Sequence, residues 1–194
     1  MTSVTGLDEA ISLLLSGAVG VLPTDTVYGL VARAHDQQAV TRLYALKNRE
    51  CKPGTIIAAS AEQLIELGFD AHMLQKASQF WPASLSIVVP TSHKIAYLDQ
   101  EVGSQPMRVP ADKNIRAMLE RTGPLVTSSA NHPGKPTAET IEDAYNYFKE
   151  RVDFYVDGGN LGFRPPSTII RFSDTGTFEI LREGAVKITP PSTL

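Results

Sequence analysis

The sequence predicts an α/β fold in which helices flank a mixed β-sheet. Up to about residue 150, segments with helical spacing of apolar residues alternate with short runs rich in β-branched residues. From residue 154 the pattern changes to short strands separated by turns that contain glycine and proline. Alternation followed by a strand-rich end predicts a sheet with both parallel and antiparallel pairs.

The composition is that of a globular protein. With 194 residues, 42% of them hydrophobic, and no Gly/Ser-rich or charge-rich linker, we expect residues 1–194 to form a single domain. The net charge of −3 gives no overall attraction to nucleic acid, although it is compatible with a local basic patch. The single Cys51 excludes an internal disulfide framework.

Nothing in the sequence predicts membrane association. No apolar run is long enough to span a bilayer, and the start of the chain lacks a basic region followed by an apolar segment. We therefore expect a cytoplasmic protein.

Helices and strands alternate in the first part of the chain. Thr5 with Asp8, and Ser60 with Gln63, have the spacing of capping boxes, and Asp36 is a third candidate cap. The predicted elements are a helix from Leu7 that Gly17 ends, a strand from Ala18 to Leu22, a helix from Asp36 to about Lys47, a strand from Thr55 to Ala59 and a helix that Gly68 ends.

The second part continues this alternation and then becomes strand-rich. The predicted elements are a helix over 72–80, strands over 85–89 and 107–109, a helix over 114–121, a strand over 125–127, a helix from about 140 to 151, and strands over 154–156, 167–172 and 178–181.

The first polar cluster follows the strand that ends before Pro23. Proline cannot continue a sheet ladder, so the chain should leave the strand there. The stretch Thr24-Asp25-Thr26-Val27-Tyr28-Gly29 is too polar for a core and too compact for a linker, which favours donors held beside a cleft. An ordinary strand-to-helix turn explains the same residues equally well.

The second polar cluster is Lys47-Asn48-Arg49-Glu50-Cys51-Lys52-Pro53-Gly54. Three cations close together after a helix are compatible with a solvated surface next to the negative end of the helix dipole. Pro53 and Gly54 shape the loop, however, and cations held together despite their repulsion favour an anion site.

The third polar cluster is Ser128-Ser129-Ala130-Asn131, followed by Gly134-Lys135-Pro136-Thr137. It is compatible with a helix cap, and no histidine stands in the context of a catalytic triad, so we interpret these groups as hydrogen-bonding ligands. Arg108 lies between apolar neighbours, where it is suited either to a structural ion pair or to bidentate capture of a carboxylate.

Metal and common nucleotide-binding motifs are absent from the sequence. The histidines and Cys51 lack zinc-site spacing, so we expect no metal site in the protein. There is neither a Walker A lysine loop nor a G-x-G-x-x-G turn, so a bound nucleotide would require another design.

Taken together and in order, these motifs resemble the threonylcarbamoyl-AMP synthase (YrdC-like) family in its short form. The matching segments are Pro23 to Leu30, Lys47-x-Arg49 with Lys52-Pro53, Trp81-Pro82, Arg108-Val109-Pro110, Ser129-Ala130-Asn131, Ser167-Thr168-Ile169 and Arg182-Glu183-Gly184. The resemblance implies an open, twisted mixed sheet with flanking helices around a positively charged concave cavity. It also implies that L-threonine, bicarbonate and ATP react to give threonylcarbamoyl-AMP and pyrophosphate, for the threonylcarbamoyladenosine modification of tRNA.

The resemblance also assigns site residues. It implies catalytic roles for Lys47 and Arg49. The residues matching amino-acid contacts are Thr24, Thr26, Ile57, Arg108, Ser129 and Ser167. Those matching nucleotide contacts are Arg49, Lys52, Ser104, Asn131, Arg182 and either Thr137 or Thr140, with Thr137 preferred.

The implied ligands are small molecules, with ATP as a substrate together with Mg²⁺ and no tightly bound cofactor. Separate threonylcarbamoyl-transfer proteins are the implied partners, together with contact to tRNA or double-stranded RNA. The alternatives are an RNA-binding module of the same fold that has no adenylyl-transfer activity, and a structural interpretation in which the motifs are only turns and caps.

Overall fold

The computed structural model describes residues 4–48, 51–173 and 177–189. The strands are β1 (Gly20–Pro23), β2 (Tyr28–Arg33), β3 (Thr55–Ile57), β4 (Leu85–Pro90), β5 (Ser104–Arg108), β6 (Leu125–Ser129), β7 (Phe154–Tyr155), β8 (Thr168–Phe172) and β9 (Phe178–Arg182). The helices are α1 (Leu7–Leu15), α2 (Gln37–Leu46), α3 (Ala61–Leu67), α4 (Ala71–Ser78), α5 (Ala96–Asp99), α6 (Lys113–Thr122) and α7 (Ile141–Phe148), with 3₁₀ turns η1 (His93–Ile95) and η2 (Lys149–Arg151).

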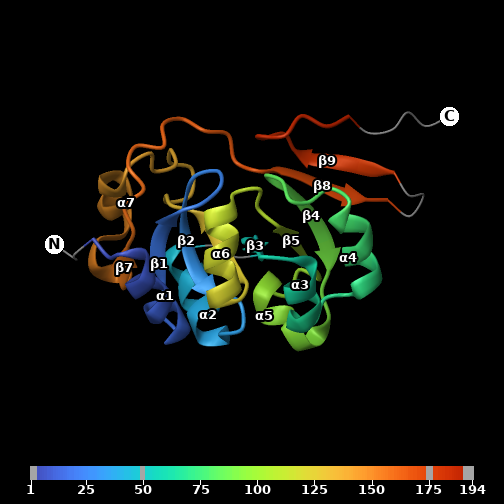
Figure 1. Ribbon diagram of the computed structural model, residues 1–194, viewed down its shortest axis with the longest axis horizontal. Helices are drawn as coiled ribbons and strands as arrows, with labels where there is room; N and C mark the ends of the chain where they lie inside the picture. Colours follow the sequence, from blue (N-terminus) through green and yellow to red (C-terminus); the bar gives the residue numbers. More distant parts are fainter. Residues whose placement is uncertain (1–3, 49–50, 174–176, 190–194) are drawn as a thin grey trace.

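These strands form one mixed sheet with helices around it (Figure 1). Across the described residues its order is β7-β1-β2-β6-β3-β5-β4-β8-β9. The pairs β1/β7, β3/β5 and β4/β8 are parallel, whereas the hairpins β1/β2 and β8/β9 are antiparallel. The predicted α/β fold with an open mixed sheet is confirmed.

The strand register brings the first and third polar clusters together. Gly29 lies opposite Leu22 of β1 on one side and Ser129 of β6 on the other. The turn after β1 and the tip of β6 therefore lie at the same end of the sheet. Residues about a hundred positions apart in the sequence become neighbours through this pairing alone, because β2 and β6 are adjacent in the sheet.

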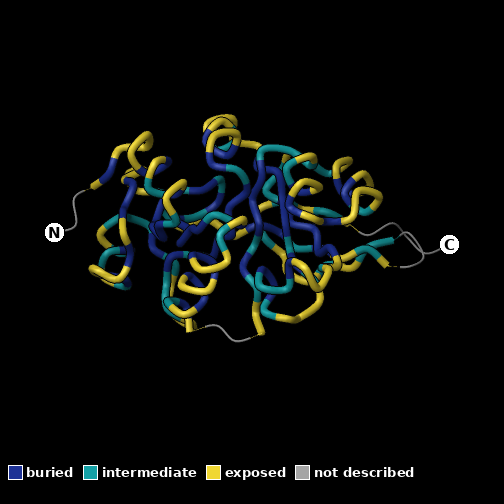
Figure 2. The backbone as a smooth tube through the Cα atoms, turned by 90° about the horizontal axis from the view of Figure 1, so that it is seen from below, coloured by how far each residue is buried: buried dark blue, intermediate teal, exposed yellow. Residues whose placement is uncertain are grey.

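The two faces of the sheet bury separate hydrophobic clusters. Successive residues of a strand point to opposite faces. Ile56 packs with residues of α2 to α5 and α7, whereas its neighbour Ile57 packs with residues of α1 and α6. Figure 2 shows burial concentrated in the strands and exposure on the outer helices and loops. Among the described residues, no helix has the length and apolarity needed to cross a membrane.

One strand, β2, is absent from the sequence prediction. The polar loop predicted from Thr24 ends earlier than expected, and five of the six residues of Tyr28–Arg33 are buried in a strand. The physical reason is the apolar run Leu30-Val31-Ala32, which is typical of a strand buried on both faces.

The caps of two helices differ from the prediction. The N-cap of α1 is Gly6 rather than Thr5, and it makes no side-chain cap hydrogen bond. At α3, Ser60 accepts a hydrogen bond from the Gln63 backbone N–H, as predicted. The reciprocal half of the box is missing, because the Gln63 side chain accepts from Ala59 N at 2.9 Å instead.

Two further boundaries are corrected. The helix predicted to reach Arg151 ends at Phe148, because Lys149 has a positive φ of 49° and a 3₁₀ turn follows. The strand predicted to start at Met107 begins at Ser104, where it pairs with β4.

Candidate active site

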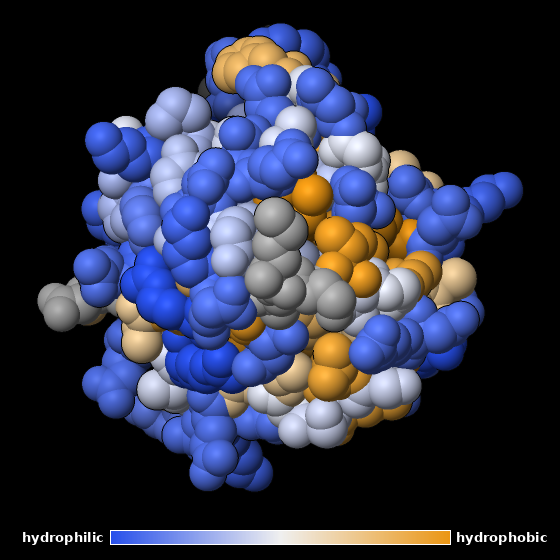
Figure 3. Space-filling view, turned by 90° about the vertical axis from the view of Figure 1, so that its left-hand side faces the viewer, coloured by the Kyte–Doolittle hydropathy of each residue, from blue (hydrophilic) through white to orange (hydrophobic). Residues whose placement is uncertain are grey.

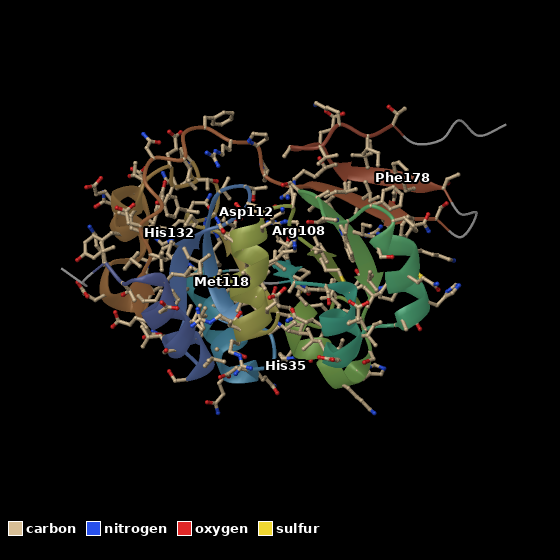
Figure 4. The ribbon with its side chains drawn as sticks, viewed as in Figure 1. His35, Arg108, Asp112, Met118, His132 and Phe178 are labelled. Atoms are coloured by element: carbon tan, nitrogen blue, oxygen red, sulfur yellow. The ribbon has the colours of Figure 1, made fainter. Side chains whose placement is uncertain are left out.

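A cavity of about 210 Å³ opens at the end of the sheet where the two polar clusters meet. We call it the central cavity. It is lined by Thr24, Thr26, Val27, Gly29, Pro53, Thr55, Pro106, Arg108, Thr127, Ser128, Ser129, Thr137, Pro166, Ser167, Ile169 and Arg182. Figure 4 shows Arg108 near the middle of the sheet, at the same end as Asp112 and away from His35.

Arg108, at the end of β5, is held by a buried ion pair. Its Nε donates to both carboxylate oxygens of Asp25 at 3.1 and 3.2 Å, and its Nη2 donates to Asp25 Oδ1. Both side chains are 3% exposed, so the pair is removed from water. Ser84 Oγ also donates to Asp25 Oδ2 at 2.8 Å, and Arg108 Nη2 reaches Thr26 Oγ1 at 3.5 Å. The structural ion pair considered for Arg108 is therefore present, within a cavity wall.

The turn between β1 and β2 is organised by Thr24. Its backbone N–H and its hydroxyl both donate to Val27 O, the hydroxyl at 2.7 Å. Thr24 Oγ1 lies 3.3 Å from Thr26 Oγ1, so the two predicted hydroxyl groups are neighbours on the cavity wall. Gly29 allows this close packing, since a Cβ there would lie 2.5 Å from Thr127 Oγ1 and 3.0 Å from Thr24 Cγ2.

Tyr28 has a structural role rather than the predicted place beside a cleft. Its ring is fully buried, its hydroxyl donates to Gly159 O, and it accepts from Gly158 N, both at 2.8 Å. Burial raises the pKa of this phenol, and the nearby Asp157 carboxylate adds to the effect. Tyr28 thus joins β2 to the segment that leads to Ser167.

Ser167 and Arg182 form another part of the wall of the central cavity. Arg182 donates from Nε and Nη2 to Ser167 O at 3.0 and 2.7 Å, and from Nη2 to Ser167 Oγ at 3.1 Å. Ser86 Oγ donates to Ser167 Oγ at 3.0 Å. Two arginines from different parts of the sheet, Arg108 and Arg182, are therefore held beside one cavity by protein acceptors.

A second cavity of about 460 Å³ adjoins the first, and we call it the flanking cavity. Its lining residues are Lys47, Asn48, Lys52, Ser129, Asn131, Pro133 and Gly134. Ser129 lines both cavities, so a ligand passing from one to the other would pass this residue.

Lys47 is 2% exposed and holds the turn at the tip of β6. Its Nζ donates to Ser129 O at 2.7 Å, to Asn131 Oδ1 at 2.8 Å and to Asn131 O. Ser129 Oγ also donates to Asn131 Oδ1, at 2.8 Å. The amide oxygen of Asn131 is therefore engaged inside the protein. These hydrogen bonds offset the free-energy cost of burying the charge of Lys47.

Most of the predicted site residues that the structure describes lie in these two cavities, but Ile57 and Ser104 do not. Ile57 is fully buried in the hydrophobic cluster with α1 and α6, so its side chain cannot contact a ligand there. Ser104 lies at the far end of β5 from Arg108 and lines neither cavity. Arg49 lies outside the described residues. Of the two threonine alternatives, Thr137 lines the central cavity. Thr140 instead caps α7 in a capping box.

Some lining residues were not predicted. Thr55 and Thr127 lie opposite each other on β3 and β6 and face the cavity. A polar side chain inside an otherwise apolar buried strand is the signal that identifies them. Asp25 was part of the first polar cluster but had no assigned role. A buried arginine needs a counterion, so a buried Arg108 predicts an acidic partner, and Asp25 is that partner.

Larger hollows elsewhere contain few residues of the polar clusters, and Thr24 is the predicted site residue that lines one of them. A groove of about 870 Å³ between α2 and α5 contains only Asn48 from the second polar cluster. Another hollow, of about 700 Å³, lies beside the starts of α1 and α6 and includes the exposed Val4 and Leu7. Figure 3 shows apolar residues gathered within a mostly hydrophilic face at this side of the molecule.

The described residues offer no protein-bound metal centre. Within residues 4–48, 51–173 and 177–189, no three His, Cys, Asp or Glu side chains gather in a way that could hold a metal ion. The polar groups of the two cavities are cations, hydroxyls and amides, which are suited to anions and to an amino acid. The positive charge expected of the whole cavity stays a prediction.

Comparisons of the sequence agree with the motif resemblance. A family model named Sua5_yciO_yrdC and described as "Telomere recombination" matches residues 12–184. The chain is 34% identical over 176 residues to the threonylcarbamoyl-AMP synthase of Pseudoalteromonas translucida, covering 87% of this chain and 94% of that relative. It is 29% identical over 188 residues to the enzyme of the same name from Pseudomonas syringae, covering 95% and 100%.

Solved structures share the fold. P. abyssi Sua5 complexed with L-threonine matches with a TM-score of 0.80 at 28% identity, over 92% of this chain and 54% of that one. The chain thus spans about half the length of the Sua5 structures it matches. E. coli YciO matches with a TM-score of 0.78 at 24% identity, over 93% of this chain and 90% of that one, which shows the fold alone. By motif order, sequence match and fold, the chain belongs to the Sua5/YciO/YrdC family.

Proposed function

We propose that this chain is an L-threonylcarbamoyl-AMP synthase, a nucleotidyltransferase that uses L-threonine, bicarbonate and ATP. The observation that carries the proposal is the junction at Ser129. On one side lies a small cavity with Arg108, and on the other lies a cavity lined by Lys47 and Lys52. The names of the relatives, and the threonine held by a similar Sua5 structure, support the same reaction.

The central cavity is suited to the amino acid. A guanidinium group binds a carboxylate through charge-assisted hydrogen bonds, so Arg108 is assigned to the threonine carboxylate. The hydroxyl groups of Thr24, Thr26, Ser129 and Ser167 line the same cavity and are assigned to the amine and hydroxyl of threonine. Its volume of about 210 Å³ is of the scale of an amino acid rather than a nucleotide.

The flanking cavity is assigned to the triphosphate. Lys52 lines it, and Arg49 belongs to the same polar cluster of the sequence. Asn131 lines the same cavity and is assigned to the nucleotide there, while Thr137 and Arg182 on the central cavity are assigned to the end of the nucleotide nearest the amino acid. Mg²⁺ would arrive with ATP and stabilise charge on the departing pyrophosphate.

The reaction requires no protein nucleophile. The amine of threonine and bicarbonate form a carbamate with loss of water. A carbamate oxygen then attacks the α-phosphorus of ATP, and the bond between that phosphorus and the β-bridging oxygen breaks as pyrophosphate leaves. The protein contributes in two ways. It aligns the carbamate with ATP, and its cationic side chains stabilise the charge that develops on the phosphates.

Lys47 is assigned to the architecture of this junction. Its ammonium donates to the backbone and side-chain oxygens of the Ser129–Asn131 turn, which fixes the residues that both cavities share. Such preorganised polar groups commonly contribute a rate factor of about 10² to 10³. We expect Lys47→Ala and Arg49→Ala each to lower turnover by roughly a hundredfold on this basis.

The test is incubation of the purified chain with ATP, Mg²⁺, bicarbonate and L-threonine, followed by pyrophosphate measurement and mass analysis of the adenylate. L-serine and L-valine replace threonine in parallel, and Ser12→Ala, on the outer surface of α1, serves as a matched variant control. We expect pyrophosphate and a threonylcarbamoyl adenylate. Steeply salt-dependent RNA binding without pyrophosphate would instead favour an RNA-binding module.

The proposed product also implies partners. An acyl adenylate is an activated intermediate, so we propose that separate transfer proteins pass its threonylcarbamoyl group to tRNA in the cytoplasm. The net charge of −3 makes any direct tRNA contact a local one. The transfer step is tested by asking whether a transfer activity copurifies with the chain. That activity is measured by adding tRNA and following the incorporation of threonine.

A further inference from the structure

We propose that Asp25 and Ser84 are positioning residues that aim the Arg108 guanidinium at the carboxylate of the amino acid. This inference rests on the proposed function, because it assigns a direction to the arginine that the reaction would use. The three residues come from three separate parts of the chain: the turn after β1, the position just before β4 and the end of β5.

Asp25 engages one edge of the guanidinium. Nε donates to both oxygens of the carboxylate, and Nη2 donates to Oδ1. Ser84 Oγ also donates to Oδ2, at 2.8 Å, so the carboxylate cannot rotate without losing a hydrogen bond. Each member of the Arg108–Asp25 pair is 3% exposed, and little water is available to replace a lost contact.

The remaining edge of Arg108 is left for a ligand. No described residue accepts a hydrogen bond from Nη1, whereas Nε and Nη2 are both engaged. Arg108 lines the central cavity, so a buried arginine of the cavity wall retains an uncommitted donor. Arginine has five donors in a fixed planar fork, so holding one edge determines the direction of the other.

This arrangement favours recognition by geometry over recognition by net charge. Without a ligand, the Arg108–Asp25 pair has no net charge, so this part of the cavity wall does not attract every anion equally. A carboxylate that matches the Nη1 edge gains a hydrogen bond from a donor whose orientation is already fixed, and it avoids the cost of ordering a long side chain. A pair that served only the stability of the fold would not have to leave a donor beside the cavity.

Ser84→Ala is the main test, because it removes one hydrogen bond and leaves the ion pair intact. The lost hydrogen bond acts on threonine only through the orientation of Asp25 and Arg108, so we expect the KM for threonine to rise roughly threefold to tenfold. The KM for ATP should stay unchanged. Ser84→Thr keeps the hydroxyl and should restore the KM for threonine, and Ser12→Ala controls for serine replacement in general.

Asp25→Asn extends the test to the carboxylate. It should raise the KM for threonine more than Ser84→Ala does. If Ser84 acts through Asp25, adding Ser84→Ala to Asp25→Asn should produce little further change, because interacting residues give non-additive effects. Binding of L-threonine and of its carboxamide is measured alongside, and the preference for the carboxylate form should shrink in both variants.

The outcomes separate this inference from the proposed function. A selective rise in the KM for threonine, with the preference for carboxylate reduced, supports the positioning role. Unchanged kinetics, or equal changes in the KM for threonine and for ATP, overturn the positioning role while the synthase reaction stands. If the wild-type chain releases no pyrophosphate with threonine, the proposed function fails and this assignment fails with it.

Discussion

Two ion pairs of similar chemistry stand in contrasting regions of the molecule. Arg108–Asp25 lies in the wall of the central cavity with both side chains 3% exposed. Arg42–Asp153 connects α2 to the start of β7 with side chains 43% and 34% exposed. The outer pair also has further partners, because Asp153 accepts from Val19 N at 2.8 Å and Arg42 donates to Arg151 O at 2.9 Å.

The contrast shows that the free-energy cost of desolvating charged groups falls on the pair in the cavity wall. Desolvating two charges is expensive, and the attraction between them often does no more than offset it, so a buried pair is weak evidence for added stability. The cavity pair is explained better by the directed donor that it leaves for a ligand. The outer pair stays solvated and contributes modestly to the scaffold.

The largest expected effect comes from breaking the cavity pair. Arg108→Met leaves Asp25 buried without its counterion, which should lower the free energy of unfolding by about 3 to 5 kcal/mol. Urea denaturation of the purified variant and of the wild type measures this change in the free energy of unfolding. Arg108→Met combined with Asp25→Asn removes both charges and should recover much of this loss without recovering activity. Equal instability of the single and double variants would contradict this account.

An intermediate effect is expected at Gly29, where β2 passes the cavity. A Cβ at this position would lie 2.5 Å from Thr127 Oγ1, so Gly29→Ala should destabilise the protein by about 1 to 3 kcal/mol through overpacking. Gly6→Ala is the matched control, because its added Cβ meets nothing within 4 Å. Thermal unfolding of both variants should separate them, and a similar change in each would argue against close packing at Gly29.

The smallest effect is expected at the outer pair. Asp153→Asn should lower the free energy of unfolding by less than about 1 kcal/mol, because the pair is partly exposed and screened by solvent. Its effect should depend on pH. Burial alone would raise the pKa of Asp153, but the Arg42 side chain and Val19 N–H outweigh it and hold that pKa below its ordinary value of 3.8.

The sign of this pH dependence follows from the lowered pKa. The stabilisation is present above the unfolded-state pKa and is lost as pH falls through the folded-state pKa. The difference in stability between wild type and Asp153→Asn should therefore be constant near neutral pH and shrink below about pH 4. A difference that grew on acidification would contradict the assigned shift.

The sequence was sufficient for features that depend on local chemistry. Asp36, Ser60 and Gly68 mark helix ends as predicted, because caps depend on residues close in the chain. The ordered motifs located most of the lining of both cavities. β2 was missed because its buried strand begins directly after the polar turn, and the short apolar run Leu30-Val31-Ala32 was not separated from that turn.

Other features depend on pairing that local patterns do not contain. The Asp25–Arg108 contact joins residues 83 positions apart, and strand order decides it. The same holds for Ile57, which neighbours Arg108 in the sheet register but packs its side chain among apolar residues. Lys47 lines the flanking cavity, and its hydrogen bonds to oxygen atoms of Ser129 and Asn131 join residues more than 80 positions apart.

The most direct test of the central claim is a crystal structure of the chain with L-threonine and a non-hydrolysable ATP analogue. The account predicts the threonine carboxylate within hydrogen-bonding distance of Arg108 Nη1, and the triphosphate beside Lys52 in the flanking cavity. Threonine bound away from Arg108, or a nucleotide bound outside the cavity that shares Ser129, would contradict it.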